Sequence, residues 1–402
     1  MEQICDRNRC TGCLACMNIC PVQAITVVED GLGVSYPQIN SEKCIDCKAC
    51  EKVCPANSLP LFKYPTACYA AHVGKRKDPG RKICASGGVA TALSAYWIEQ
   101  KKGVVYGTRW NKDFMPEVCR VDRMEDLNSL KGSKYIQSNI GFSYQSVKED
   151  LKQNIPVLFI GTPCQVAGLK NYLKKEYENL LLVDLICHGV SPVSYWRDEW
   201  NYLKSKHRFT GITDIRFRGN DRQNFRLSVW RKDQMLWGSS AYSQPYFSGF
   251  LKAVSLRENC YSCAYAQPAR ISDLTIGDFI GLGRDIPYPY TYSEVGNRSV
   301  VIVNTELGES FYEKVSTSIS QFVSVKRDYQ EAVKYGPSLR APFPHHSLTD
   351  KFRSVYVSEG WVKAIRKTLG WSCFQNKWQI RMSYLWRVPR KICRIILKGD
   401  KL

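Results

Sequence analysis

Two apolar runs in the middle of the chain, each followed by an amphipathic stretch, give the clearest hydrophobic pattern in the sequence. Residues 156–160 and 180–186 are almost continuously apolar, which is typical of strands buried on both faces. Residues 166–177 place aliphatic side chains on one face and lysines on the other, and residues 193–206 predict a second helix. This order of strand, helix, strand and helix predicts parallel strands joined by a right-handed crossover.

Further strands are predicted on both sides of this unit, because short apolar or alternating runs occur there between turn residues. A helix is predicted to open on the Gly-Gly turn within residues 83–99. The sequence therefore predicts an α+β fold with a small amino-terminal domain, a larger α/β domain and a helical tail, over residues 1–60, 61–344 and 345–402. The additional strands are predicted at residues 24–28, 34–39, 104–107, 213–218, 225–230, 273–279 and 299–304.

Two cysteine runs of identical spacing lie in the first 55 residues, each of the form C-x2-C-x2-C-x3-C-P. In a small two-cluster ferredoxin, three cysteines of each run hold one 4Fe-4S cluster and the fourth holds the other. Zinc and disulfides are the alternatives, and neither is typical of interlocked, proline-terminated runs. The first thiol set is therefore Cys10, Cys13, Cys16 and Cys54, and the second thiol set is Cys44, Cys47, Cys50 and Cys20.

Four more cysteines are candidates for a third site. Cys164 and Cys187 follow the two buried strands, and the carboxyl ends of parallel strands meet at one edge of a sheet. Each cysteine is expected just before a helix, where the helix dipole would lower the pKa of a thiol. Cys260 and Cys263 supply two further thiols, and together the four form the third thiol set. Four thiolates suit either zinc or a 4Fe-4S cubane.

The remaining cysteines and the Gly-Gly turn have simpler alternative explanations. Gly87 and Gly88 would let a pyrophosphate approach the backbone of a helix start, or would let that helix pack closely against a neighbour. Lys134 is expected to be solvated unless an anionic cofactor lies near it. Ordinary buried thiols are expected at Cys5, Cys68, Cys119, Cys373 and Cys393.

Composition and charge restrict the class of protein and its partners. The chain has 402 residues, 18 cysteines and a net charge of +20, and no signal sequence or transmembrane segment is expected. Reduced thiols that bind metal point to the cytoplasm. Residues 345–402 hold 13 Lys or Arg against 3 Asp or Glu, interleaved with tryptophans. This tail is expected either to attach peripherally to an anionic membrane face or to pack on its own domain. Nucleic acid is not expected as a partner, because no matching motif occurs.

Five motifs, in order, resemble the coenzyme F420 hydrogenase/dehydrogenase beta-subunit family, and the chain is similar to members with a fused amino-terminal ferredoxin. The resemblance covers roughly residues 1–340. The motifs are Ser-Gly-Gly-Val-Ala-Thr-Ala-Leu, Gly-Ser-Lys-Tyr-Ile-Gln-Ser, Gly-Thr-Pro-Cys-Gln-Val-Ala-Gly-Leu, Asp-Leu-Ile-Cys-His-Gly-Val, and a C-x2-C pair followed by Asp-Leu-Thr-Ile-Gly-Asp.

This resemblance implies FAD and an additional iron–sulfur cluster beside it. It implies that the third thiol set holds a cubane, and that the flavin site includes Gly87, Gly88 and Thr91, with Lys134 and Tyr135 nearby. The expected function is a flavin-dependent iron–sulfur oxidoreductase that acts on a small organic substrate. The alternative is an electron-transfer subunit that serves a redox partner protein and has no substrate site of its own.

Overall fold

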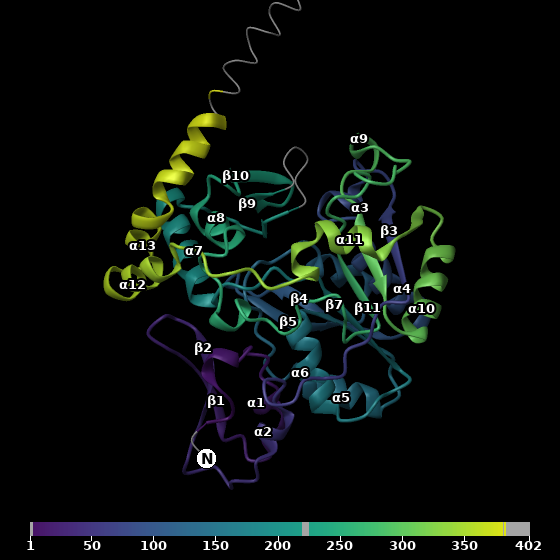
Figure 1. The fold of residues 1–402 in the computed structure, drawn as a ribbon, viewed down its shortest axis with the longest axis horizontal. Coiled ribbons are helices and arrows are strands. Elements are labelled where there is room, and N and C mark those ends of the chain that lie inside the picture. The colour runs from purple at the N-terminus through teal and green to yellow at the C-terminus, as the bar shows by residue number, and fades with distance from the viewer. Residues whose placement is uncertain (1–2, 219–224, 381, 383–402) are drawn as a thin grey trace, which may run out of the picture.

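The computed structural model describes residues 3–218, 225–380 and 382, and an eight-stranded mixed sheet lies at its centre (Figure 1). The four central strands run parallel to one another, as the two buried runs predicted. The outer strands pair antiparallel with their neighbours. In spatial order the strands are β13 (Phe322–Arg327), β3 (Ala67–Val73), β12 (Ser299–Val303), β11 (Leu274–Asp278), β7 (Leu180–Leu185), β6 (Val157–Gly161), β4 (Val104–Trp110) and β5 (Pro116–Val121).

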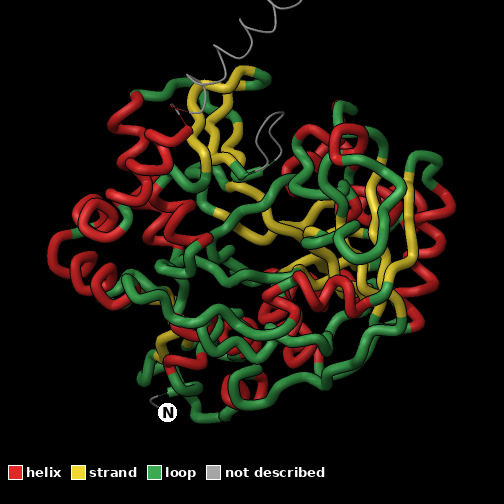
Figure 2. The backbone as a smooth tube through the Cα atoms, turned by 45° about the horizontal axis from the view of Figure 1, so that its top comes forward, coloured by secondary structure: helices red, strands yellow, loops and turns green. Residues whose placement is uncertain are grey.

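Helices cover both faces of this sheet (Figure 2). Because successive side chains of a strand point to opposite faces, Leu158 packs toward one layer while Val157 and Phe159 pack toward the other. Fully burying such a side chain stabilises the fold by about 1.5–3 kcal/mol. The first layer contains α4 (Val89–Lys101) and α10 (Glu306–Ser318), and the second contains α5 (Ser143–Lys152) and α6 (Pro163–Leu173).

The amino-terminal ferredoxin-like module packs against the second helix layer. Its predicted hairpin is present, and β1 and β2 pair antiparallel. The side chain of Asn18 donates to the Gly141 carbonyl at 2.9 Å, and Arg197 of α7 (Val193–His207) pairs with Glu29 at 2.7 Å. The module consists of η1 (Arg7–Arg9), α1 (Ala15–Ile19), β1 (Ile25–Glu29), β2 (Ser35–Ile39) and α2 (Ala49–Val53).

A three-stranded antiparallel sheet and several helices form a separate aromatic core beside the central sheet. The predicted hairpin is found here as β8 and β9, extended by β10. Its elements are α7 (Val193–His207), β8 (Asp214–Arg216), β9 (Arg226–Arg231), β10 (Gln234–Ser240), α8 (Pro245–Leu251), α12 (Thr349–Glu359) and α13 (Trp361–Thr368). Short helices elsewhere are α3 (Pro79–Lys82), η2 (Met124–Leu130), η3 (Glu258–Cys260), α9 (Tyr292–Val295), α11 (Tyr329–Tyr335) and η4 (Pro337–Leu339).

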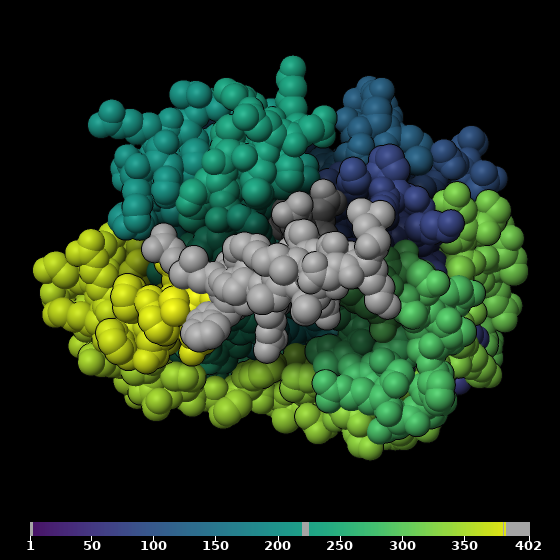
Figure 3. All heavy atoms as spheres, turned by 90° about the horizontal axis from the view of Figure 1, so that it is seen from above, coloured from purple at the N-terminus to yellow at the C-terminus, as the bar shows by residue number. Residues whose placement is uncertain are grey.

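The start of the basic tail belongs to this aromatic core, at one end of the molecule (Figure 3). Trp361 is buried, and its indole N–H donates to Glu199 of α7 at 2.7 Å. Trp371 and Trp378 follow in a helical stretch and are 69% and 56% exposed. No helix in the described part of the chain is both long and apolar enough to cross a membrane. Outside the described residues lie Tyr384, Leu385, Trp386, Ile392, Cys393, Ile395 and Ile396.

Candidate iron–sulfur and cofactor sites

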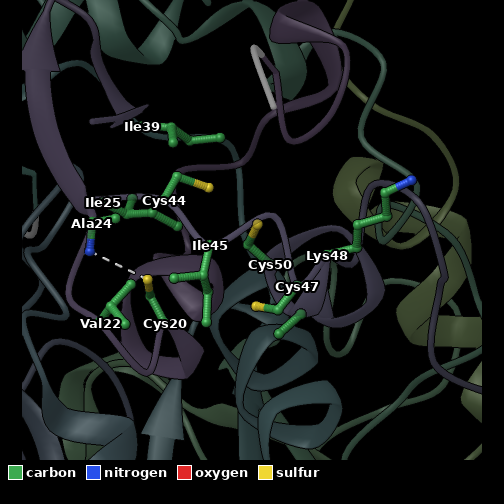
Figure 4. A pocket seen from close by; sticks show the side chains of 11 residues that line it. Cys20, Val22, Ala24, Ile25, Ile39, Cys44, Ile45, Cys47, Lys48 and Cys50 are labelled. Atoms are coloured by element: carbon green, nitrogen blue, oxygen red, sulfur yellow. Dashed lines mark hydrogen bonds between the residues drawn. The ribbon is translucent and has the colours of Figure 1, made fainter. Parts of the chain in front are cut away.

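The second thiol set lines one pocket of the ferredoxin-like module (Figure 4). Apolar side chains, including Ile25, Ile39 and Ile45, complete the lining. The Ala24 N–H donates to the sulfur of Cys20 at 3.3 Å, so one thiol already accepts a backbone hydrogen bond. Four thiols around an apolar pocket provide the donors that a 4Fe-4S cluster requires. The lining cysteines are Cys20, Cys44, Cys47 and Cys50.

The first thiol set lies deeper, at the contact with the main domain. Burial raises the pKa of the Cys16 thiol, and the neighbouring thiols of Cys13, Cys10 and Cys54 raise it further. These mutual effects require the four sulfurs to lie close together. A cluster would relieve this repulsion, because iron stabilises the thiolate form.

Cys5 has a role that the sequence did not indicate. Its thiol is within hydrogen-bonding reach of Cys10 and Cys54, and these contacts raise the pKa of Cys5. The prediction of an ordinary buried thiol was therefore incomplete, since Cys5 contacts two predicted cluster ligands. Cys5 lies outside the two regularly spaced cysteine runs, so nothing in the sequence indicated this contact.

The third thiol set lines a second pocket, at the carboxyl edge of the parallel strands. Thr11 of the ferredoxin-like module also lines this pocket, which brings the first and third thiol sets next to each other. Among the described residues, no three Cys, His, Asp or Glu side chains converge closely enough to hold a single metal ion. The four thiols line one shared pocket, which a cluster bound by four thiolates would occupy. They are Cys164, Cys187, Cys260 and Cys263.

Local sequence explains how Cys164 is positioned. Thr162 caps α6, and its backbone N–H donates to the Gln165 side chain at 3.0 Å in a capping box. Pro163 occupies the first helical position, where its missing N–H costs nothing. Gln165 also donates to the Ser138 hydroxyl at 2.9 Å. Cys164 is thus held in the first turn of the helix, directly after β6.

The expected lowering of thiol pKa at helix starts was wrong. Burial raises the pKa of Cys164 to about 11, and burial followed by neighbouring thiols raises that of Cys187 further above its usual value. Cys187 is also not at a helix start, since α7 begins only at Val193. Desolvation of a buried thiol therefore outweighs the helix dipole here.

Gly87 and Gly88 lie at the same edge as the third thiol set, because β3 runs in the same direction as β11 and α4 follows it. Gly87 serves close packing: a Cβ there would lie 2.3 Å from the Ala71 carbonyl oxygen, and its N–H donates to the Ser299 hydroxyl. Gly88 has a φ of +83° and gives α4 no side-chain cap. Thr91 lies in the first turn, and its hydroxyl is 3.7 Å from the sulfur of Cys84.

Basic side chains gather around this helix start. Arg81 is buried and donates to the carbonyl oxygens of Ser86, Val295 and Asn297, and burial lowers its pKa. The Nε atoms of Arg81 and Arg298 are buried and have no hydrogen-bond partner in the described part of the chain. Orphaned donors beside an uncapped helix start fit an anionic group such as a pyrophosphate.

Lys134 and Tyr135 lie on a neighbouring loop, which contacts the segment before Gly87 through a 3.4 Å hydrogen bond from Lys131 to the Gly80 carbonyl. Lys134 is partly buried rather than solvated, and burial lowers its pKa to about 8. Its ammonium lies 5.8 Å from the centre of the Trp110 ring.

Tyr135 belongs to a polar network that the sequence did not reveal. Arg218 donates to the Tyr135 hydroxyl at 3.0 Å and pairs with Asp278 at 2.7 Å. Asp278 ends β11, so the network lies at the carboxyl edge of the sheet. The Tyr135 ring stacks on Phe250 with centroids 4.7 Å apart.

Comparisons with known proteins define the class first. Residues 9–58 match the 4Fe-4S dicluster domain, and residues 156–325 match the family described as the carboxy-terminal part of the coenzyme F420 hydrogenase/dehydrogenase beta subunit. The protein is thus an iron–sulfur electron-transfer protein of the oxidoreductase class. The match over residues 156–325 confirms the resemblance to the coenzyme F420 hydrogenase/dehydrogenase beta-subunit family that the sequence motifs indicated.

One solved structure is similar over most of the chain. A chain of the F420-reducing NiFe hydrogenase complex from Methanosarcina barkeri superimposes with a TM-score of 0.44 and 16% sequence identity. The match covers 76% of this chain and 92% of that chain. No curated protein gives a significant match.

Proposed function

We propose that this chain is a flavin-dependent iron–sulfur oxidoreductase. Electrons would pass between two 4Fe-4S clusters in the ferredoxin-like module, a third 4Fe-4S cluster and FAD. An organic substrate would then be reduced or oxidised at the flavin. The proposal rests on the row of three thiol sets, which extends from the surface of the module to the carboxyl edge of the sheet.

The order of sites in this row follows from contacts between them. The second and first thiol sets share α2, because Cys50 lies in that helix and Cys54 follows it. Two tyrosines bridge the first and third sets: the pKa of Tyr265 and of Tyr144 is raised first by burial and then by thiols of both sets. Cys47 is exposed, so the outer end of the row is accessible to a redox partner protein.

When bound, the clusters would transfer single electrons and FAD would convert these into two-electron chemistry on the substrate. The chain would supply the ligands, exclude water and hold the groups in fixed positions. The buried side chains of Tyr144 and Tyr265, beside the first and third sets, keep solvent away from that part of the row. Arg81, Arg298 and the uncapped start of α4 would hold the pyrophosphate of FAD.

Anaerobic purification followed by iron, sulfide and flavin analysis tests the proposal directly. About twelve irons and one flavin per chain are expected, four irons for each of three cubanes. Arg81→Gln should lower the flavin content while leaving the iron content unchanged. Eight irons with no flavin would contradict the proposal.

An electron-transfer subunit without its own substrate site is the second candidate function, and the exposed Cys47 end of the row favours it equally. Under that function the isolated chain would reduce a small acceptor only after a partner protein is added. Turnover by the isolated chain with a chemical reductant and a small organic acceptor, in the absence of any added protein, would support the enzyme instead.

A further inference from the structure

Arg257 is a fully buried cation whose hydrogen-bond partners are all neutral. Its residue is 1% exposed, and its guanidinium donates to four oxygens at 2.7–3.2 Å. In the described part of the chain, no carboxylate lies within ion-pair distance of it. The four acceptors are the Asn259 side chain, the Ser35 carbonyl, the Gln137 side chain and the Cys10 carbonyl.

This arginine connects the first and third thiol sets physically. Its side chain reaches the backbone of Cys10, a member of the first set. Its own backbone N–H donates to the Val190 carbonyl at 3.0 Å, three residues after Cys187. The Cys260 N–H in turn donates to the Arg257 carbonyl at 3.0 Å. Arg257 therefore sits between the two sets and is held by both loops of the third.

Burying a charge without a counter-ion is strongly unfavourable, so such a group requires an explanation. Two other buried arginines near the sheet edge do have carboxylate partners: Arg270 pairs with Asp184 at 3.0 Å, and Arg218 pairs with Asp278 at 2.7 Å. The bonds to the backbone of Cys10 and of Cys260 instead place Arg257 beside one cysteine of the first thiol set and one of the third. A 4Fe-4S cluster held by four thiolates carries a net negative charge, and two such clusters would flank this arginine.

We propose that Arg257 is the shared counter-charge of the clusters in the first and third thiol sets. This role rests on the proposed function and adds a residue that sets the redox properties of the row. A positive charge stabilises the more negative, reduced form of a cluster and therefore raises its reduction potential. Arg257 thus favours electrons on the first and third clusters over the second cluster.

Redox titration of the anaerobically purified holoprotein, followed by electron paramagnetic resonance, tests this role. Arg257→Gln should shift the reduction equilibria of the first and third clusters at least tenfold toward the oxidised form. A tenfold shift of a one-electron couple corresponds to about 59 mV. The second cluster should not change and serves as an internal reference. Arg257→Lys, which keeps the charge, should leave the reduction potentials of both clusters close to those of the wild type.

Two further variants separate charge from docking of the module. Arg197→Gln removes an exposed ion pair that also joins the module to the main domain, and it should change no potential. Gln137→Glu places a carboxylate beside Arg257, 2.7 Å away in the native contact, and offsets its charge without removing it. This variant should lower both potentials even if Arg257→Gln does not fold.

The outcomes distinguish this role from the proposed function. Wild-type protein with eight irons would contradict the third cluster, while the first cluster would still report on Arg257. Full iron content with unchanged potentials in Arg257→Gln, or in Gln137→Glu where the first variant does not fold, would overturn the counter-charge role.

Discussion

At the scale of single residues, the most specific prediction concerns the third thiol set, because its cysteines come from three segments that meet only in the folded chain. Cys263→Ala should lose about four of about twelve irons and leave the ferredoxin signals intact. Cys164→Ala should have the same effect, since all four thiols would share one cluster. Iron analysis and electron paramagnetic resonance of the purified variants measure both outcomes.

The matched control is Cys119→Ala, which removes a partly buried thiol from β5, outside all three thiol sets. Its iron content should equal that of the wild type. Full iron content in Cys164→Ala would show that the loop after β6 does not supply a ligand.

The sequence could predict which cysteines form the thiol sets, but not the residues that lie between these sets in the fold. Cysteine spacing within a run is local, so three thiols of each ferredoxin set could be predicted from the sequence alone. Arg257 gave no such signal, because its partners Ser35 and Cys10 lie 222 and 247 residues away in the chain. Tyr265 likewise carries no motif, and only the fold places it between two thiol sets.

At the scale of elements, the junction of β6 and α6 controls the position of Cys164. Thr162→Val should remove the side-chain cap, which is worth about 1 kcal/mol. Hydrogen exchange of amides in the first turn of α6 should then increase about fivefold in the holoprotein. The third cluster should also become easier to remove with a chelator, because Cys164 lies in that turn.

Thr291→Val is the control for this prediction, since Thr291 forms a capping box on the remote helix α9. It should increase exchange only at α9 and leave all clusters unaffected. Equal chelator sensitivity in both variants would mean that the cap of α6 does not hold the ligand.

Elements were predictable where pattern and pairing are local. The parallel pair β6 and β7 followed from two apolar runs around one helix, and the pairing was confirmed. The position of β3 between β12 and β13 was not predictable, since strands paired across more than 200 residues leave no local periodicity. For the same reason, the packing of Gly87 against Ala71 and Ser299 could not be distinguished from a ligand contact.

At the scale of the whole molecule, the helical stretch over residues 370–380, here called the tail helix, lies at the opposite end from the ferredoxin-like module (Figure 1). Trp371, Phe374 and Trp378 recur at helical spacing and are 56–69% exposed, whereas Trp361 is part of the core and cannot insert elsewhere. We expect this helix to bind an anionic membrane surface, since each nearby Lys or Arg contributes about 1 kcal/mol. Attachment there would leave the module facing the solvent.

Vesicle sedimentation measures this attachment. Binding to anionic but not neutral vesicles is expected, and salt should weaken it. Replacing Trp371 and Trp378 together by alanine should lower binding roughly tenfold or more, because each removes apolar surface from the interface. Tyr64→Ala, which removes an exposed aromatic residue beside the module, should have no effect. Equal binding by all variants would exclude the aromatic face as the anchor.

Because β3 lies between β12 and β13, two strands from late in the chain, it also determines the order in which the fold can be completed during synthesis. Both ferredoxin thiol sets have left the ribosome once Cys54 has emerged, so their ligands are available first. The third set must wait for Cys263, and β3 acquires its two neighbours only after Arg327. Until then β3 has two unpaired edges, which are a site for unwanted association. The ferredoxin-like module is therefore followed by a strand whose edges stay unpaired until more than 200 further residues have been synthesised.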